Sequence, residues 1–535
     1  MFAIRYSSYL NSSNPYVLFK AEREDLYYID KSLILEELFE PDKFICLTRP
    51  RRFGKSVTAT MIASFFGKGA DSSAVFDNLK ISRTSSFKKH LNSRNVIFIN
   101  LDHQPCRCES FFDYIGSIKS NLLSDLREAY PGVGSETDNL PQLLQEICEI
   151  KGEKFMFVLD NWDYPFRTSF ATAKDKEDYL AFLSSLLNNR PYVSSAYMTG
   201  IFPIAKFSSD SGLSMFLDCN VASDRFSNYF GFSNSEVDEL FKIYEAQPAK
   251  EHPISRDGLR IWYDGYSDAH IYNPVSVVNA LMVSLLDYQW TTYGSGDEIF
   301  FAVQGNISAV LADLAFLVSG EQVPFSFAPT PASAIAPRDK TLSELVVKGL
   351  LTITGSWARI PNNEIMNKFE YTIYRHKSLG YLHELAFHSK ETLAATLEKN
   401  TKEICRLLDK TAFSCIFSFF GEHELSAIVS LAYLLARDRY DIVRKSSGER
   451  QCVDFLFFPH DPSDDCIILE LRVGNTPRPA IAHLKEKNYA IAFQETSIQY
   501  KGRLLLVGIA LSKKTKKFSC DIKTGKRSQK KPDLS

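Results

Sequence analysis

The stretch Phe44-Ile-Cys-Leu-Thr-Arg-Pro-Arg-Arg-Phe-Gly-Lys-Ser56 decides the fold of the first part of the chain. Its first five residues form a short apolar run typical of a buried strand, and Gly54-Lys55-Ser56 follow as a tight loop that opens a helix. Free N–H groups and the positive dipole end at such a helix start bind phosphate. The pattern therefore predicts a phosphate-binding loop, although Arg49 stands where the common G-x-x-x-x-G-K-[ST] pattern has its first glycine.

The chemistry of this loop predicts a site for ATP and Mg²⁺. Gly54 allows close backbone approach to phosphate, Lys55 reaches the β- and γ-phosphates, and the Ser56 hydroxyl binds Mg²⁺. A second Mg²⁺ ligand is expected at the end of a neighbouring strand, and Asp160 ends the apolar run Phe155–Asp160. The residues assigned to the nucleotide are Arg51, Arg52, Phe53, Gly54, Lys55, Ser56, Val57 and Asp160. For Arg51 and Arg52, contact with phosphate and packing against the fold both remain open.

The residue after Asp160 bears on hydrolysis. An acid at this position polarises the attacking water in most enzymes of this kind, but this chain has Asn161. An amide can orient water and is a very poor base, so slow or absent hydrolysis is expected. Asp163, two residues further on, is a candidate for a partial substitute.

Strand-like and helical patterns alternate over the first 200 residues. Helical spacing of apolar residues after Lys55, from Tyr114 to Leu126 and from Leu180 to Leu187 predicts helices between the strands. This alternation predicts an α/β fold with a parallel sheet covered on both faces. The expected strands are Lys43–Thr48, Asn95–Leu101, Lys154–Asp160 and Ser194–Thr199.

The rest of the chain predicts further segments. Helices are expected over Glu236–Tyr244, Pro274–Leu286, Lys390–Leu408, Glu422–Leu435 and Ala480–Ala492, and strands around Leu350–Thr354 and over Cys452–Phe458, Cys466–Val473 and Arg503–Leu511. The predicted organisation is a P-loop domain at 1–220, a helical continuation at 221–330, a small mixed region at 331–410, a mixed α/β domain at 411–512 and a tail at 513–535.

That tail is rich in lysine and arginine. A solvated, disordered tail is one interpretation, and a nuclear-localisation signal or nucleic-acid-binding arm is the other. The basic residues are Lys513, Lys514, Lys516, Lys517, Lys523, Lys526, Arg527, Lys530 and Lys531.

Composition sets the broad class of the protein. The chain has 535 residues, of which 45 % are hydrophobic and 24 % charged, as in an ordinary folded protein. Its net charge of −2 gives no overall affinity for nucleic acid, so any such contact needs a local patch. The ten scattered Cys indicate reduced thiols, and we expect an intracellular protein, cytoplasmic or nuclear. Because no apolar run approaches the roughly 18 residues of a transmembrane helix, no membrane partner is expected.

Several motifs resemble those of one family. They include Tyr28-Ile-Asp-Lys-Ser, Thr48-Arg-Pro-Arg-Arg-Phe-Gly-Lys-Ser, Asp160-Asn-Trp-Asp-Tyr-Pro, Thr199-Gly-Ile-Phe-Pro-Ile-Ala-Lys, Trp262-Tyr-Asp-Gly-Tyr, Tyr272-Asn-Pro-x-Ser and Ile360-Pro-Asn-Asn-Glu-Ile. In this order they resemble the AAA-ATPase-like family whose members usually carry a C-terminal PD-(D/E)XK nuclease-type domain. The chain departs from the family at Asn161, where an acid is usual, and at Pro203, where a polar or basic residue is usual.

The resemblance implies a restriction-endonuclease-like fold near the C-terminus. Nucleases of this type hold Mg²⁺ between an acid on one strand and an acid-x-Lys on the next. Asp454 and Glu470 match the acids, Arg472 stands at the lysine position, and Glu424 on the preceding helix is a further candidate. Arg472 keeps its proton and can only bind or orient. His483 matches the position near which the family has a glutamine.

Two functions therefore remain open at this point. The first is an ATP-binding AAA-type module fused to a PD-(D/E)XK nuclease-like domain that acts on, or is regulated through, nucleic acid, with DNA favoured. The second is a degenerate pseudo-enzyme that serves as a nucleotide-binding switch or a protein-interaction scaffold. Because AAA-type modules often act as rings, a homo-oligomer is a further expectation.

Overall fold

The computed structural model describes residues 8–39, 43–103, 108, 110–134, 137–207, 212–248, 250, 253–267, 269–287, 297–327, 335–412, 421–444, 453–486 and 500–525. The chain forms two compact units. The first comprises Met1–Gly294, Phe325–Ser356 and Pro361–Glu364, and the second comprises Ser295–Pro324, Trp357–Ile360 and Ile365–Ser535. This division differs from the five predicted segments, and each unit is described by itself.

A five-stranded parallel sheet forms the centre of the first unit. Its strand order is β2-β3-β4-β1-β5, with bounds β1 Phe44–Thr48, β2 Asn95–Asn100, β3 Phe155–Asp160, β4 Val193–Gly200 and β5 Leu217–Cys219. The predicted parallel sheet is confirmed, and the four predicted strands match within one or two residues. Because β4 lies between β1 and β3, the end of β3 and the loop after β1 are brought to the same edge of the sheet.

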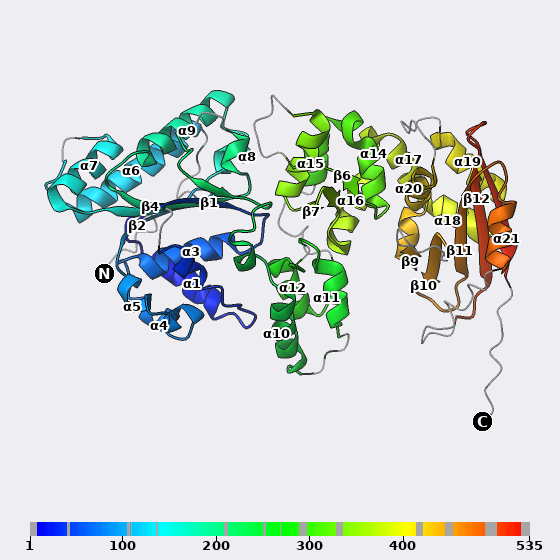
Figure 1. Ribbon diagram of the computed structural model, residues 1–535, viewed down its shortest axis with the longest axis horizontal. Coiled ribbons are helices and arrows are strands. Elements are labelled where there is room, and N and C mark those ends of the chain that lie inside the picture. Colours follow the sequence, from blue (N-terminus) through cyan, green and yellow to red (C-terminus); the bar gives the residue numbers. More distant parts are fainter. Residues whose placement is uncertain are drawn as a thin grey trace. The chain divides into compact units, whose positions relative to one another are not determined.

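Helices cover both faces of this sheet, as Figure 1 shows. One face packs against α6 (Phe111–Ala129), α7 (Leu140–Lys151) and α9 (Ala173–Leu187), whose apolar residues join the strands in one core. The other face packs against α1 (Asn14–Arg23) and α3 (Lys55–Phe66) in a second core. The central strands are therefore buried on both sides, which explains their continuous apolar runs.

A helical subdomain follows the sheet within the first unit. It consists of α10 (Asn234–Glu245), α11 (Arg256–Tyr263) and α12 (Pro274–Val283), which share a core with Tyr27. Short helices α2 (Ile34–Glu37), α4 (Ser73–Phe76), α5 (Phe87–His90) and α8 (Tyr164–Arg167), together with α15 (Pro337–Val347) and β7 (Thr352–Thr354), complete this unit. Helix α12 ends three residues before the predicted bound, because Ser284 adopts a left-handed conformation there (φ 56°).

The second unit joins a helical part to a mixed sheet. Its helices are α13 (Glu298–Val303), α14 (Ile307–Val318), α16 (Asn363–Arg375, which begins in the first unit), α17 (Tyr381–Phe387), α18 (Ser389–Leu397), α19 (Thr401–Ala412), α20 (Glu422–Ala432) and α21 (Arg478–Glu486), and β6 (Val323–Pro324) pairs with β8 (Trp357–Arg359). The single helix predicted over Lys390–Leu408 is wrong. Lys399 takes a left-handed conformation (φ 58°) and Asn400 Oδ1 accepts from Glu403 N at 3.2 Å, so one helix ends and another begins.

The C-terminal sheet has the order β13-β12-β11-β10-β9. Its bounds are β9 Tyr440–Arg444, β10 Phe455–Pro459, β11 Cys466–Val473, β12 Leu504–Leu511 and β13 Phe518–Thr524. Strands β9, β10 and β11 form an antiparallel meander, and α21 connects β11 to the parallel strand β12. The predicted tail at 513–535 is wrong in its first half, because β13 pairs antiparallel with β12 along seven residues. Lys526, Arg527, Lys530 and Lys531 lie outside the described residues.

No helix within the described part of the chain is long and apolar enough to cross a membrane.

Candidate functional site

The phosphate-binding loop connects β1 to α3 in the first unit. Lys55 is the first residue of α3, and Gly54 caps the helix in a left-handed conformation (φ 85°). A Cβ at Gly54 would meet no atom within 4 Å, so the backbone conformation rather than lack of space favours glycine here. Arg52 also has a positive φ of 68°, which makes this a tightly wound loop.

Lys55 lies buried beneath the loop. Its Nζ donates to the carbonyl oxygen of Pro50 at 2.7 Å. Burial lowers the pKa of Lys55 to about 8, while the negative charges of Asp160 and Asp163 act in the opposite direction. The ammonium group therefore sits among opposite charges at the place where a phosphate chain would enter.

Asp160 lies at the end of β3, as predicted, and is almost fully buried. Its carboxylate accepts hydrogen bonds from the hydroxyls of Ser56 and of Thr199, the latter at 3.2 Å. Burial raises the pKa of Asp160, against the effect of these hydrogen bonds and of Lys55. Ser56 and Asp160 thus bring a hydroxyl and a carboxylate oxygen together, which are the ligand types that Mg²⁺ prefers.

Arg49, at the position of the missing glycine, binds backbone rather than a ligand. Its Nη1 donates to the carbonyls of Thr48, Cys219 and Asn220 at 2.8, 2.9 and 2.7 Å, and Nη2 donates to that of Arg225 at 3.3 Å. The side chain is buried, and burial lowers its pKa to about 10. Arg49 therefore ties the end of β1 to the segment after β5 and lies behind the phosphate-binding loop.

Asn161 has a conformation that explains its residue type. Its φ is 60°, in the left-handed region that asparagine tolerates better than most residues. Its Nδ2 lies 3.5 Å from Oδ1 of Asn100 at the end of β2. Asn161 lines the same cavity as Lys55 and Ser56, where it can orient a water molecule but not remove its proton.

The expectation that Asp163 could substitute for the missing acid is wrong. Its side chain is fully buried, and Oδ2 accepts from the N–H groups of Ile201 and Phe202 at 3.1 and 3.0 Å. Arg167 forms an ion pair with the same oxygen at 3.4 Å. Asp163 therefore holds the segment after β4 in place and is absent from the cavity lining.

A cavity of about 720 Å³ opens over the phosphate-binding loop. Its lining contains every nucleotide-assigned residue of the loop, namely Arg51, Arg52, Phe53, Gly54, Lys55, Ser56 and Val57. The same lining includes the apolar or aromatic side chains of Tyr28, Ile29, Phe232, Pro274 and Val278 and the acids Glu22, Asp25 and Asp102. The size lies within the usual range of ligand sites, and a lining that combines a phosphate-binding loop with apolar side chains suits a nucleotide.

Sequence reasoning missed the apolar wall and Arg167. Tyr28, Phe232 and Pro274 each belong to a family motif, the second of them in Tyr229-Phe-Gly-Phe-Ser, but the sequence does not predict that they meet. Phe232 and Val278 lie some 200 residues or more beyond Tyr28 and reach the cavity only through the tertiary fold. Lys31, from the same motif as Tyr28, is held by Glu236 at 2.7 Å. The motif around Tyr28 therefore joins the cavity wall to the start of α10.

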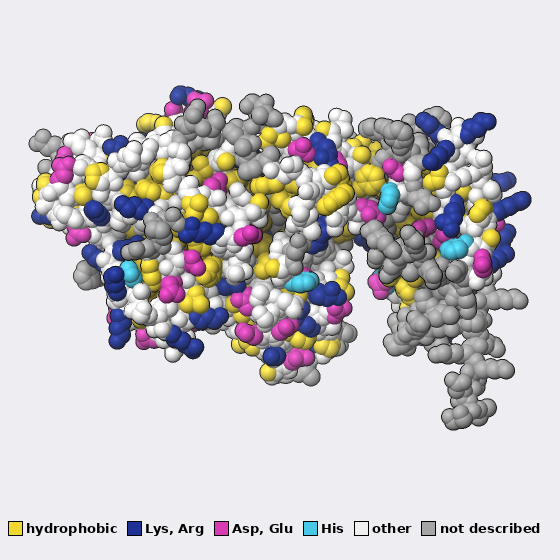
Figure 2. All heavy atoms as spheres, in the orientation of Figure 1, with side chains coloured by type: hydrophobic (Ala, Val, Ile, Leu, Met, Phe, Trp, Pro, Cys, Tyr) yellow, Lys and Arg dark blue, Asp and Glu magenta, His cyan; other side chains and the backbone are white. Residues whose placement is uncertain are grey.

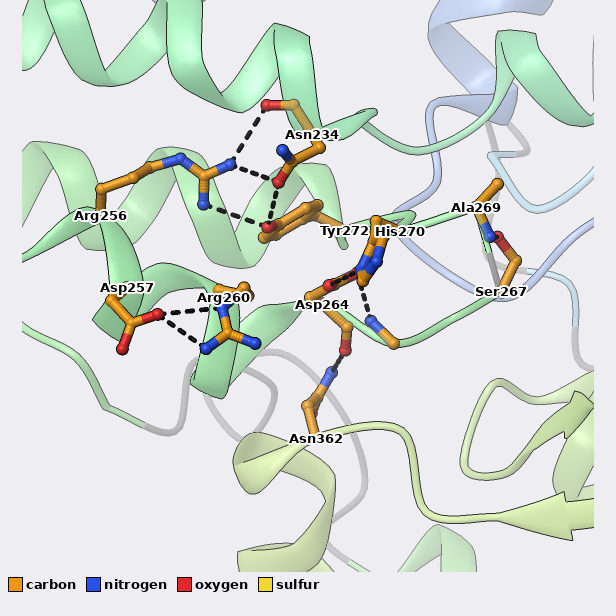
Figure 3. Close-up of polar contacts among 11 residues, drawn as sticks. Asn234, Arg256, Asp257, Arg260, Asp264, Ser267, Ala269, His270, Tyr272 and Asn362 are labelled. Carbon is orange, nitrogen blue, oxygen red and sulfur yellow. Dashed lines mark hydrogen bonds and ion pairs between the residues drawn. The ribbon is translucent and has the colours of Figure 1, made fainter.

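The later family motifs form a polar cluster, drawn in Figure 3. Asn362 Nδ2 donates to the backbone carbonyl of Asp264 at 2.7 Å, and the Asp264 carboxylate contacts His270 Nδ1 at 2.6 Å. The ring of Tyr266, in the same motif as Asp264, packs edge-on against Phe53 of the phosphate-binding loop, with 4.9 Å between ring centroids. These motifs therefore stabilise the fold around the loop.

The candidate acids of the second unit lie across two neighbouring strands. The antiparallel register pairs Phe455 with Leu469, so Asp454 comes opposite Glu470. Asp454 Oδ2 accepts from the N–H of Leu471 at 2.7 Å.

The surroundings of Glu470 are cationic. Its side chain is 3 % exposed, and Oε1 forms ion-pair contacts with Arg472 Nη2 at 2.6 Å and His483 Nδ1 at 3.1 Å. Glu424 does not join this pair, because its carboxylate accepts from the N–H of Gly421 at 2.8 Å and caps α20. Within the described ranges, no group of three or more His, Cys, Asp or Glu is arranged to hold a metal ion. Arg472 stands where a divalent cation would need to be, so the described residues do not fit Mg²⁺ here.

Comparison with known proteins supports the assignment of the first site. Residues 19–209 match the family model described as a predicted AAA-ATPase. The first unit therefore contains an AAA-ATPase-like, P-loop nucleotide-binding module. The chain is also 28 % identical over 268 residues to an uncharacterised protein of the vnfD 5' region in Azotobacter chroococcum. That match covers 48 % of each protein, so the chain spans about half the length of this curated relative.

Solved structures with remote similarity include two archaeal proteins. The Walker-type ATPase paby2304 of Pyrococcus abyssi is 12 % identical, and the match covers 63 % of this chain and 94 % of that one with a TM-score of 0.36. The Cdc6p protein of Pyrobaculum aerophilum is 13 % identical, covering 63 % and 92 % with a TM-score of 0.24. TM-scores this low add nothing to the family match.

Proposed function

We propose that the first unit binds ATP with Mg²⁺ and hydrolyses it much more slowly than a typical ATPase does. The observation that carries this proposal is the cavity lined by Lys55, by Ser56, whose hydroxyl is hydrogen-bonded to Asp160, and by apolar side chains. The wall, formed in part by Tyr28 and Phe232, suits the adenine base, and the loop suits the phosphates. The match of residues 19–209 to a predicted AAA-ATPase family supports the same proposal.

Ser56 and Asp160 are the residues that would hold Mg²⁺. The hydrogen bond between them brings two oxygen groups into one small site, and both groups are hard ligands of the type this ion takes. Bound there, Mg²⁺ would neutralise charge on the phosphates. Lys55 would bind the same phosphates, and the α3 N-terminus would donate its free N–H groups to them.

Slow hydrolysis follows from the residues beside Asp160. Asn161 cannot accept the proton of an attacking water, and the Asp163 carboxylate is used by the backbone of Ile201 and Phe202. A positioned general base contributes about 10²–10⁴-fold to such a reaction. The absence of this base favours a switch that changes state when ATP binds, rather than an enzyme with rapid turnover.

Equilibrium binding of labelled ATP with Mg²⁺ tests this proposal. Lys55→Ala should weaken binding about 30-fold, or about 2 kcal/mol, because a buried cation is lost from the phosphates. Lys68→Ala is the matched control, because Lys68 lies just past the other end of α3 with a side chain 45 % exposed. Absence of binding to the wild type, or equal loss in both variants, would refute the proposal.

A second measurement addresses turnover. Phosphate release by the wild type should be slow, and Asn161→Glu should raise it about tenfold or more by supplying a base. A rapid wild-type rate that Asn161→Glu leaves unchanged would contradict slow hydrolysis while leaving ATP binding intact.

We also propose that the second unit binds nucleic acid without cutting it. Its mixed sheet, with a helix between the two parallel strands and an acid pair across β10 and β11, supports a nuclease-like ancestry. The occupation of Glu470 Oε1 by Arg472 and His483 argues against a metal-dependent reaction.

A basic turn supports the nucleic-acid part of this proposal. Four of the six residues between β12 and β13 are exposed lysines, namely Lys513, Lys514, Lys516 and Lys517. Leu511, at the end of β12, pairs with Val473 of β11, so this turn lies at the same end of the sheet as Arg472. Figure 2 shows several Lys and Arg side chains on the surface of the second unit. Lysine clusters of this kind bind the phosphate backbone without reading sequence.

Fluorescence anisotropy with labelled duplex DNA at several salt concentrations tests this candidate. Replacing the four turn lysines by Glu should weaken binding at least about tenfold and reduce its salt dependence, because phosphate contacts release counterions. The control makes the same charge change elsewhere, at Lys20, Lys88, Lys89 and Lys174. No cleavage is expected with Mg²⁺ or Mn²⁺, and cutting that Asp454→Ala or Glu470→Ala abolishes would contradict the proposal.

A further inference from the structure

Asn279 is an amide side chain in an otherwise apolar part of the nucleotide cavity. It lies on α12, whose opposite face is buried in the core of the helical subdomain. The face of α12 that lines the cavity consists of Pro274, Val275, Val278, Asn279 and Met282, which have the spacing of one helix face. Asn279 is the one member of this face whose side chain forms hydrogen bonds.

The amide of Asn279 is left to water or to a ligand. Neither Oδ1 nor Nδ2 forms a hydrogen bond with any residue that the structure describes. The residue is half-buried and neither amide atom is shut off from solvent, so the amide faces the cavity rather than the protein interior. An asparagine amide offers an acceptor and a donor side by side. The ligand that it suits best therefore presents a donor and an acceptor at the same spacing.

The apolar residues beside Asn279 belong to one cluster. Val278, its neighbour in the chain, packs with Ile29 and Phe232 in the core of the helical subdomain. Phe53 of the phosphate-binding loop packs in a different cluster, together with the strands of the sheet. When the phosphates of a nucleotide lie at the loop, its base lies against the apolar cluster, and Asn279 is the amide at that position.

The acids and the other asparagine of the cavity lining do not offer this pair of groups to a base. Glu22 and Asp25 lie close to each other, and Asp25 Oδ1 already accepts from a backbone N–H at 2.8 Å. Asp102 and Asn161 lie near Asp160, at the proposed Mg²⁺ site. A carboxylate accepts hydrogen bonds but does not donate them, so these acids cannot bind a base edge that needs both.

Adenine has an edge that matches the amide. Its N6 amino group donates and its neighbouring N7 accepts, so one asparagine side chain binds both at once. Guanine presents two acceptors, O6 and N7, at the same positions. The amide oxygen of Asn279 would repel guanine O6, and turning the amide around would leave a single hydrogen bond. The amide therefore distinguishes the two purines.

We propose that Asn279 binds the N6 and N7 edge of adenine and thereby makes the cavity prefer ATP to GTP. The inference rests on the proposed ATP site and adds to it the residue that selects the base. ATP and GTP carry the same phosphates, so Lys55 and Ser56 bind both alike, and the preference comes from the part of the cavity that contacts the base. A bidentate contact of this kind distinguishes one base from another by about tenfold or more.

Competition against labelled ATP, with unlabelled ATP, GTP and 7-deaza-ATP in the presence of Mg²⁺, tests this inference. The wild type should bind ATP at least about tenfold more tightly than GTP. It should bind 7-deaza-ATP, which has a C–H group in place of N7, at least about threefold more weakly than ATP. Asn279→Ala should weaken ATP binding about tenfold, change GTP binding by less than about twofold and bind 7-deaza-ATP as well as ATP.

Two further variants control for size and for packing. Asn279→Asp keeps the size and the acceptor but loses the donor, so it should also lose the preference for ATP. Met282→Ala is the matched control, because it removes an apolar side chain from the same face of α12 and leaves the amide in place. It should leave the ratio of the ATP and GTP affinities unchanged.

The outcomes separate this inference from the proposal on which it rests. A wild type that binds neither ATP nor GTP refutes the ATP site itself. A wild type without a preference for ATP over GTP or over 7-deaza-ATP, or a preference that persists in Asn279→Ala, refutes the role of Asn279 alone. Thermal melting without nucleotide shows whether Asn279→Ala still folds. If it does not fold, Asn279→Asp decides the question, because a loss confined to ATP supports the inference and an unchanged ratio of the two affinities refutes it.

Discussion

The lowered pKa of Lys55 predicts that ATP affinity falls as the pH rises from 7 to 9. ATP binds the protonated lysine, whose pKa is about 8 in the nucleotide-free protein because the group is buried. About 90 % of the molecules carry this proton at pH 7 and about 9 % at pH 9. The affinity should therefore fall about tenfold, which corresponds to about 1.4 kcal/mol.

The sign of the effect follows from linkage. Bound phosphates raise the pKa of Lys55, so ATP binding takes up a proton wherever the free lysine has lost it. Uptake should be about 0.1 proton per ATP at pH 7 and about 0.9 at pH 9. The phosphates themselves add little over this range, since their last pKa lies near 6.

Labelled ATP with Mg²⁺ at constant ionic strength provides the assay, and calorimetry in two buffers measures proton uptake. Lys55→Arg keeps its charge at every pH used, and its affinity should not change between pH 7 and 9. Lys55→Met should bind weakly and equally at both values. Arg49, with a pKa of about 10, is the other buried cation near the loop and would act mainly above this range. A constant wild-type affinity, or the same slope in Lys55→Met, would refute the reasoning.

Two further predictions concern residues that hold the site together. Arg49→Gly restores the common glycine but leaves the carbonyls of Cys219 and Asn220 without their donor. We therefore expect the free energy of unfolding of the first unit to fall by about 3 kcal/mol and calorimetry to show a lower melting temperature. An unchanged or higher melting temperature would contradict this role of Arg49. Asp163→Ala removes the acceptor of two buried N–H groups and should cost about 2–4 kcal/mol, whereas Asp163→Asn keeps an acceptor and should cost less. Equal melting temperatures for these two variants would exclude the backbone contacts as the cause.

The elements that were predicted correctly have sequence patterns that lie within one contiguous segment of the chain. The central strands are continuous apolar runs because the sheet is covered on both faces, and Asp160 ends such a run. The loop before Lys55 can be predicted from the sequence for the same reason, because the strand, the loop and the helix start are contiguous in the chain. In the second unit, the patterns of β11 and β12 are equally clear, whereas the sequence does not predict the break between α18 and α19 or the strand β13 within the basic stretch. Its lysines suggested a solvated tail, but Phe518 and Ile522 alternate with polar residues and pack inward.

The features that sequence reasoning missed depend on contacts between distant segments. Asp163 resembled a spare acid because nothing near it in the chain reveals that Ile201 and Phe202 will donate to it. Arg167 carried no motif, and its part in the cavity depends on how α8 turns back after β3. Only the asparagine at 161 carried a local signal, since a left-handed conformation favours this residue type.

Arg49 and Arg472 both depart from the sequence motif in which they stand, and the two departures have opposite consequences for ligand binding. Each replaces a residue that the corresponding motif uses for its ligand, and each binds oxygens of the protein itself. Arg49 binds main-chain carbonyls behind the phosphate-binding loop, so Lys55, Ser56 and Asp160 remain available to a nucleotide. Arg472 binds a carboxylate oxygen of Glu470, which is the group that a metal ion would need. The difference explains why a nucleotide-binding role is retained in the first unit while metal-dependent cleavage is not expected in the second.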